Sequence, residues 1–231
     1  MRAILRVMVG ALVAVLAGMA VPPVAQAKNL LVVGMPISFS AGTCSLGFFG
    51  FNARGDRLAV TSGHCAGGAD ELVYSKNGVE IGRVVAWLED VSDGHGKLTG
   101  ARGYTMFSVY KRFSLEPYFT GLGTIDEGDW VTKYGERSGK TRGRITKVKY
   151  NSDRPDLSLV YSDMVQLPGD SGCPWVTSGP TLVAMGSSGN QEQMGGGAGS
   201  QAQPIGSVIR LIKEQGGVWG DGFKVWIGDE R

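Results

Sequence analysis

Hydrophobic positions in this chain fall into short runs separated by turn-forming residues. Apolar or alternating runs cover Leu46–Phe51, Leu58–Thr61, Glu71–Tyr74, Ile81–Trp87, Tyr104–Tyr110, Trp130–Tyr134, Arg144–Tyr150, Met164–Leu167, Pro174–Val176 and Leu182–Met185. Runs of this length, bounded by Gly, Asp, Asn and Pro, predict β-strands. Many short strands with little helix between them favour an all-β barrel or sandwich.

One segment near the C-terminus departs from this pattern. Ile205, Val208, Ile209 and Ile212 form a single apolar stripe at helical spacing, and Gly216-Gly217 follows. The spacing predicts one amphipathic helix that ends at the two glycines. The segment Val218 to Arg231 has no pattern that assigns it to an element.

The N-terminal segment is apolar in a different way. Arg2 and Arg6 precede an apolar run from Met8 to Ala20, and Ala25-Gln26-Ala27 closes the segment. A basic start, a short apolar centre and an A-x-A end are typical of a secretory signal peptide. The run is short for a bilayer span. We therefore expect cleavage after Ala27, export to the extracellular space, and one domain from 28 to 231 without a membrane span.

Charge narrows the range of partners. The 231 residues carry a formal net charge of +2, and loss of Arg2 and Arg6 with the signal segment would bring it to zero. A neutral chain without basic runs gives no indication of nucleic acid or an anionic surface as a partner. No metal or other cofactor is indicated.

The chain has three cysteines. Cys44 and Cys65 bracket two apolar runs joined by a polar turn, which reads as a β-hairpin. Export favours oxidation, so we expect a disulfide between Cys44 and Cys65. Cys173 is then left over, as a buried thiol or as a reactive one, and the apolar residues that follow it favour burial.

A candidate nucleophile lies in Leu167-Pro168-Gly169-Asp170-Ser171-Gly172-Cys173-Pro174. A serine between glycines reads as a serine on a tight turn, although Gly, Asp and Ser are also common in ordinary turns. Such a turn can aim the N–H groups of Gly169 and Ser171 at one point, as an oxyanion site requires. The serine needs a base to take its proton.

The chain has only two histidines that could act as this base. His64, in Thr61-Ser62-Gly63-His64-Cys65, directly follows a predicted strand and neighbours the expected disulfide. His95 lies in a glycine-rich loop segment. His64 is therefore the candidate general base, with a purely structural histidine as the alternative.

The two motifs together resemble the chymotrypsin-like serine proteases, and most closely the bacterial branch typified by streptogrisins. Cys44-Ser45-Leu46-Gly47-Phe48, Val131-Thr132-Lys133-Tyr134-Gly135 and Gln203-Pro204-Ile205 extend the similarity. The resemblance implies two six-stranded antiparallel β-barrels with a C-terminal helix. It places His64 on the first barrel, Ser171 on the second, and the oxyanion site at Gly169 and Ser171.

The resemblance also implies an aspartate that orients the histidine, at the head of the strand Tyr104–Val109. Gly103 fills that slot. Three alternatives remain open: Asp93, favoured by its distance from His64 along the chain; Asp90; or no working acid.

Two further roles follow from the resemblance. Asp170 is expected to be buried beside the serine with a cation as its partner. Arg137 and Arg142 are candidates for this cation, and the alternative is that both are solvated surface charges. Val165 is expected at the base of the primary substrate pocket, with the segment Met185 to Gly189 as one wall. Without an acid at the base, the pocket favours an apolar or aromatic residue before the cleaved bond. A shift in the alignment would instead place Asp163 or Gln166 nearer the base.

The sequence thus predicts a secreted, monomeric serine endopeptidase that cleaves protein or peptide substrates through Ser171 and His64, with impaired activity if no acid orients His64. The alternative, from a different class, is a catalytically inactive protease-fold protein that serves as a binding or scaffold protein. The missing acid favours the alternative, and the intact serine and histidine motifs oppose it.

Overall fold

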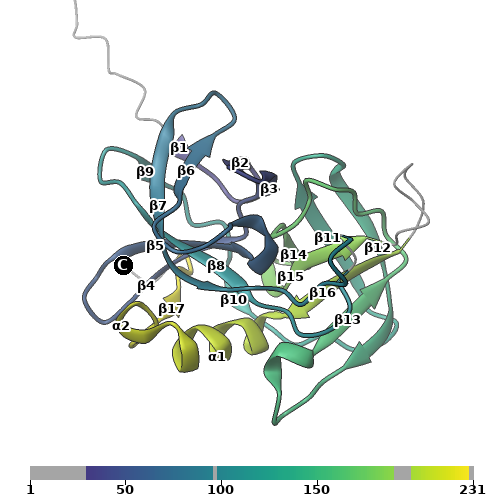
Figure 1. Cartoon of the computed structure of the whole chain (residues 1–231). Coiled ribbons are helices and arrows are strands. Elements are labelled where there is room, and N and C mark those ends of the chain that lie inside the picture. The colour runs from purple at the N-terminus through teal and green to yellow at the C-terminus, as the bar shows by residue number, and fades with distance from the viewer. Residues whose placement is uncertain (1–29, 96–97, 190–198, 229–231) are drawn as a thin grey trace, which may run out of the picture.

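The computed structural model describes residues 30–95, 98–189 and 199–228. Two β-sheet units lie side by side, and a helix near the C-terminus packs beneath them (Figure 1). The all-β expectation with a C-terminal helix is confirmed. The proposed signal segment, Met1 to Ala27, lies outside the described residues.

The first unit is a curled sheet with the strand order β17-β4-β5-β8-β7-β6-β2-β3. Its strands are β2 (Pro36–Phe39), β3 (Gly42–Ser45), β4 (Phe48–Phe51), β5 (Arg57–Ser62), β6 (Leu72–Ser75), β7 (Glu80–Leu88), β8 (Tyr104–Val109) and β17 (Lys224–Val225). A 3₁₀ turn, η1 (Gly63–Cys65), follows β5, and β1 (Leu30–Leu31) pairs with β9 (Ser114–Leu115) beside the sheet. The predicted hairpin between the two cysteines is confirmed, because β4 pairs antiparallel with β5.

The second unit is a closed barrel. Its six strands follow the order β15-β14-β11-β12-β13-β16, pairing of β15 with β16 closes the ring, and β10 adds to β15 outside it. The bounds are β10 (Gly121–Leu122), β11 (Trp130–Gly135), β12 (Gly139–Lys149), β13 (Leu159–Ser162), β14 (Pro174–Thr177), β15 (Thr181–Gly189) and β16 (Ser200–Pro204). A 3₁₀ turn, η2 (Pro155–Leu157), connects β12 to β13.

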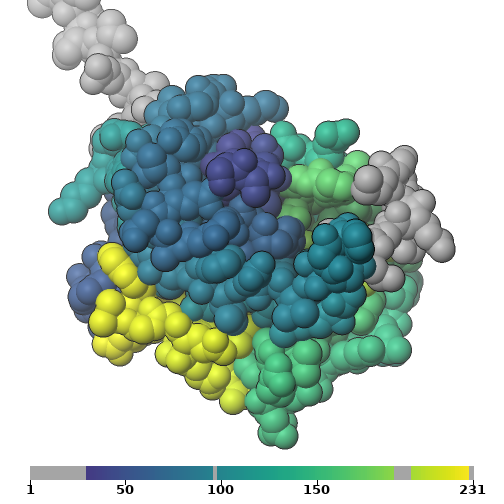
Figure 2. All heavy atoms as spheres, viewed as in Figure 1, coloured from purple at the N-terminus to yellow at the C-terminus, as the bar shows by residue number. Residues whose placement is uncertain are grey.

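The C-terminal segment returns to the first unit. Helix α1 (Ile205–Gln215) ends at Gly216, as predicted, and a short helix α2 (Gly217–Gly220) follows. Strand β17 then pairs antiparallel with the edge strand β4. In Figure 2 the yellow C-terminal residues lie against the blue first unit. This placement assigns the segment that the sequence left unassigned.

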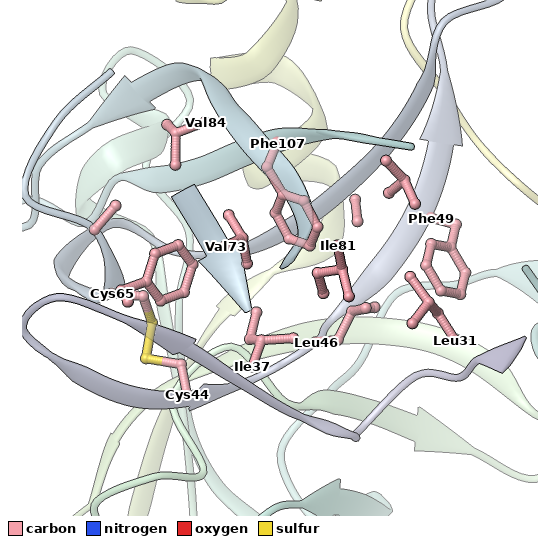
Figure 3. Packing of buried hydrophobic residues seen from close by; sticks show 14 of the residues in the cluster. Leu31, Ile37, Cys44, Leu46, Phe49, Cys65, Val73, Ile81, Val84 and Phe107 are labelled. Carbon is pink, nitrogen blue, oxygen red and sulfur yellow. A yellow bond between two sulfur atoms is a disulfide. The ribbon is translucent and has the colours of Figure 1, made fainter. Parts of the chain in front are cut away.

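Three apolar clusters form the core: one in each unit and one that the two units share. One fills the first sheet, where Ile37, Leu46, Ile81 and Phe107 are fully buried, and the Cys44–Cys65 disulfide lies at one side of this cluster (Figure 3). A second fills the closed barrel around Trp175. The third combines Phe48 and Leu58 of the first unit with Leu182 of the second and Val208 of α1. Because this cluster is shared, burial of its apolar surface stabilises the contact between the units as well as each unit.

One predicted strand is wrong. Residues 164–167 form no regular strand, and Val165 makes only an isolated parallel bridge with Gly199. The backbone here serves other partners: the Val165 carbonyl accepts from the Thr141 hydroxyl, and the Leu167 N–H donates to Asp170. The segment is therefore the start of the loop that carries Ser171.

Candidate active site

His64 lies at the end of β5, on the turn η1, and two contacts fix its position. Cys65 forms a disulfide with Cys44, with an S–S distance of 2.06 Å, so the predicted pairing is confirmed. The Trp87 indole N–H donates to the Gly63 carbonyl at 2.7 Å. The imidazole ring is therefore held at the edge of the first unit, where it meets the second.

Ser171 lies on a tight turn of the second unit. Gly169 and Gly172 flank it with φ angles of +105° and +84°, which L side chains rarely adopt. A Cβ on Gly172 would also overlap the Thr61 hydroxyl of the first unit. The two glycines thus allow the serine turn to form and to approach β5 closely.

The two residues meet at hydrogen-bond distance. His64 Nε2 lies 2.7 Å from Ser171 Oγ, and His64 Nδ1 lies 2.5 Å from Asp90 Oδ2. An ionised carboxylate only accepts hydrogen bonds, so Nδ1 carries the ring proton and Nε2 is free to accept from the serine hydroxyl. The Ser171 hydroxyl also lies 3.3 Å from the Ser187 carbonyl oxygen. The geometry is that of a nucleophile, a base and an orienting acid.

The acid beside His64 is Asp90, and the sequence ranked Asp93 ahead of it. Asp93 is exposed in the loop after β7, where its carboxylate accepts from the His95 N–H at 2.8 Å. The Asp90 side chain is 0% exposed, whereas that of His64 is 30% exposed. The preference for Asp93 is corrected, because distance along the chain did not show which carboxylate turns inward.

Asp90 reaches His64 from the strand beside the expected one. The last residue of β7, Leu88, pairs with Tyr104, the first residue of β8, so the chain just after β7 runs next to Gly103. The Gly103 N–H donates to Asp90 Oδ1 at 2.5 Å. A Cβ on Gly103 would overlap the Leu88 carbonyl, and one on Gly63 would stand 2.6 Å from Asp90 Oδ1. Both positions need glycine because the acid-bearing segment passes over them.

The cation beside Asp170 is Lys133 of β11, not Arg137 or Arg142. Lys133 Nζ lies 2.9 Å from Asp170 Oδ2, and both side chains are 0% exposed. Arg137 contributes only its backbone N–H to Asp170, and the Arg142 guanidinium lies over the Trp130 ring. Lys133 was not among the expected partners. The signal that could have identified it is the alternation of β11, in which Val131, Lys133 and Gly135 are the buried positions.

The Asp170 carboxylate accepts hydrogen bonds from other groups besides Lys133. Burial raises the pKa of its carboxyl, but hydrogen bonds from the Leu167 N–H, the Ser138 hydroxyl and Lys133 outweigh burial and bring the pKa below the ordinary value. Arg137 and Ser138 donate their backbone N–H groups to the other carboxylate oxygen. Asp170 is therefore held as an anion, and it fixes the loop on which Ser171 sits.

The remaining predicted site residues lie on the same loop. Within the described residues, the N–H groups of Gly169 and Ser171 donate no hydrogen bond to the protein. Val165 is half-buried, whereas its neighbour Gln166 is buried, with Oε1 accepting from the Trp175 indole N–H at 3.2 Å. The expected pocket wall, Met185 to Gly189, is the last part of β15, and residues 190–198 after it lie outside the described part of the chain.

Cys173 is a buried thiol rather than a reactive one. It is fully buried, and burial raises its pKa to about 12, so it is protonated at neutral pH. The other sulfur atoms do not suggest a metal centre either. The ligand atoms of Cys44, His64 and Cys65 lie within 4.8 Å of one another, but both sulfurs are joined in the disulfide and offer no thiolate.

Bacterial chymotrypsin-like serine proteases are among the solved structures that share this architecture, so the fold is that of this class. Thermobifida fusca protease A matches with a TM-score of 0.65 and 20% identity, over 87% of this chain and 100% of its own. Nocardiopsis protease matches at 0.61 and 22%, over 85% and 99%. The Cellulomonas bogoriensis chymotrypsin matches at 0.56 and 20%, over 78% and 94%. At these identities the likeness establishes the fold alone.

Sequence comparisons do not add to this assignment. No protein-family model and no curated protein matches the chain. Among the described residues, no helix is long and apolar enough to cross a bilayer.

Proposed function

We propose that this protein is a secreted serine endopeptidase in which Ser171 is the nucleophile, His64 the general base and then acid, and Asp90 the orienting acid. The observation that carries the proposal is the His64 ring itself. It contacts Ser171 through one nitrogen and a buried carboxylate through the other. A neutral serine is a weak nucleophile, and this arrangement supplies the base and fixes its tautomer.

The reaction follows from the geometry. Ser171 Oγ attacks the peptide carbonyl while His64 Nε2 takes the hydroxyl proton, and Asp90 stabilises the imidazolium that forms. The N–H groups of Gly169 and Ser171 stabilise the oxyanion. His64 then gives the proton to the leaving amine, and water repeats the sequence to release the acyl group. The Lys133–Asp170 pair supports the loop that presents both N–H groups.

The non-catalytic alternative rested on a missing acid. The distance of 2.5 Å between Asp90 Oδ2 and His64 Nδ1 supports the enzymatic proposal over this alternative. We therefore expect a binding or scaffold role only if folded protein does not react with the serine-directed probe described below.

A fluorophosphonate probe tests the proposal without knowledge of the substrate. We expect the probe to modify Ser171 and the Ser171→Ala variant to remain unmodified, with Ser152→Ala, an exposed loop serine, as the matched control. Folded wild-type protein that does not react would contradict the proposal and favour the scaffold alternative.

The substrate preference is a further part of the proposal. With Val165 at the base and no acid beside it among the described residues, the pocket accepts apolar or aromatic side chains before the cleaved bond, because a buried cation there would lack a partner. A peptide library in which cleavage follows Arg or Lys would contradict this. Export is supported by the signal-like N-terminus, and protein recovered from the medium should begin at or near Lys28.

A further inference from the structure

Arg102 is a buried cation beside the candidate triad that the mechanism above does not use. It is 2% exposed. Its Nε–H donates to the Ser187 hydroxyl at 2.9 Å, and its terminal nitrogens donate to the Gly100 carbonyl at 2.6 Å and to Gln201 Oε1 at 3.2 Å. A buried charge is costly unless it is hydrogen-bonded and balanced, so a buried arginine at this place calls for an explanation.

The contacts of Arg102 cross between the two units. It directly precedes Gly103 and β8 in the first unit. Its side chain reaches Ser187 on β15 and Gln201 on β16 of the closed barrel. Its backbone N–H donates to the Asp156 carbonyl at 2.7 Å, and its carbonyl accepts from Gln203 Nε2 at 3.2 Å. One residue therefore ties the start of β8 to three segments of the second unit.

These bonds complete a closed chain of contacts around the triad. Gly103, next to Arg102, donates its N–H to Asp90, and Asp90 contacts His64. On the other side Ser187 binds the Arg102 guanidinium through its hydroxyl, and its carbonyl oxygen lies 3.3 Å from Ser171 Oγ. The acid and the nucleophile are thus connected twice, once through His64 and once through Arg102.

We propose that Arg102 is a positioning residue that locks the Asp90-bearing segment to the Ser187 strand and balances the charge of Asp90. Its consequence for catalysis rests on the proposed function, whereas its effect on the His64 ring does not require turnover. Burial lowers the pKa of Arg102, and the electrostatic interactions with Asp90 and Tyr161 oppose this effect.

The sign of the effect on His64 follows from the charges around it. Asp90 favours the protonated ring, and the positive charge of Arg102, which interacts electrostatically with Asp90, opposes it. Across the site the Lys133–Asp170 pair is internally balanced. Burial raises the pKa of Tyr104, on β8, to about 12, so this phenol is neutral. Removal of the Arg102 charge should therefore move the midpoint of the His64 titration to higher pH.

Nuclear magnetic resonance of the ring gives a direct test, because His64 and His95 are the only histidines and His95→Gln leaves one signal. We expect Arg102→Met to raise the midpoint by about 0.5–1 pH unit. Arg102→Lys keeps the charge and should leave it within about 0.2 unit. Equal midpoints in the wild type and a folded Arg102→Met variant would overturn the inference.

A measurement on the unsubstituted protein covers the case in which the variants do not fold. The Arg102 Nε–H signal should shift with the same midpoint as the His64 ring, because Asp90 couples the two groups. A signal that stays constant through the His64 titration would also overturn the inference.

Reactivity provides a second readout. The rate of fluorophosphonate inactivation, per folded molecule, should fall about tenfold or more in both variants, since neither retains the bond from Nε to Ser187. Unchanged rates would show that Arg102 does not position the site. A wild type that fails to react would reject the proposed function instead, and the His64 midpoints would still decide the role of Arg102.

Discussion

Gly103 decides which strand supplies the acid. In the resemblance on which the sequence interpretation relied, this slot holds the aspartate. Here the Leu88 carbonyl occupies the space where a Cβ would stand. The peptide after β7 therefore passes close to β8, and Asp90 on this segment contacts His64 Nδ1. Position 103 carries no acid because the neighbouring backbone occupies the space that a side chain would need.

This arrangement predicts that an acid cannot be restored at the slot. Gly103→Asp and Gly103→Ala should both unfold the protein or lower its melting temperature sharply, because backbone cannot give way as a flexible side chain does. The control is Gly206→Ala in α1, where a Cβ meets nothing within 4 Å. The melting temperatures of the three variants, compared with that of the wild type, test this prediction. A stable Gly103→Asp variant with raised ester hydrolysis would mean that the slot was truly vacant.

Lys133 and Asp170 form a buried ion pair. We expect Lys133→Met to lower the free energy of unfolding by about 3–5 kcal/mol at pH 7, because it leaves a buried carboxylate without its cation. Lys140→Met, on the exposed side of β12, is the matched control. Chemical denaturation measures both.

The pH dependence of the free energy of unfolding tests whether ionised Asp170 is the partner of Lys133. The folded-state pKa of Asp170 is below its ordinary value, so its stabilisation is present at neutral pH and is lost as pH falls through the folded-state pKa. The gap between the wild type and Lys133→Met should therefore narrow between pH 7 and about 3. A gap that stays constant over this range would show that Asp170 is not the partner that matters.

At the scale of elements, hydrophobic alternation predicted the existence of most strands and of α1, because a half-buried strand and an amphipathic helix leave distinct periods in the sequence. It did not predict Met164–Leu167 correctly, since burial there comes from packing of an irregular loop. It also could not place Asp90. That placement depends on the register of β7 against β8, which is a contact between segments and leaves no period in either.

The C-terminal strand is an addition that the sequence did not reveal. Phe223 precedes β17, is fully buried in the shared cluster, and packs edge-on against Phe48 with ring centroids 6.4 Å apart. Gly50 of β4 has no room for a side chain because the Phe223 ring lies over it. The segment thus covers the edge of the first sheet, which would otherwise expose unpaired backbone.

We expect Phe223→Ala to cost about 3–5 kcal/mol of unfolding free energy, as large-to-small changes in packed cores do. The neighbouring Lys224→Ala, at an exposed position, should change it by less than about 0.5 kcal/mol. Urea denaturation of the two variants provides the comparison. Equal, small effects would mean that the C-terminal segment does not belong to the core.

At the scale of the whole molecule, the candidate site exists only where the two units meet. The first unit supplies His64 and Asp90, and the second supplies Ser171. Hydrogen bonds cross the junction beside them: the Ser62 hydroxyl donates to the Gly186 carbonyl at 2.8 Å, and that of Ser45 donates to the Gly169 carbonyl at 2.9 Å. The motifs identified both halves from sequence, and the structure adds the contacts that bring them together.

The central claim is that Asp90 orients His64, and turnover of an ester substrate by matched variants tests it most directly. Asp90→Asn keeps the shape of the side chain but removes the charge, and it should lower turnover about 10⁴-fold, or about 5–6 kcal/mol of barrier. Asp93→Asn, three residues along the same loop, should leave turnover within about twofold of the wild type. The opposite ranking, or full activity in both folded variants, would contradict the account.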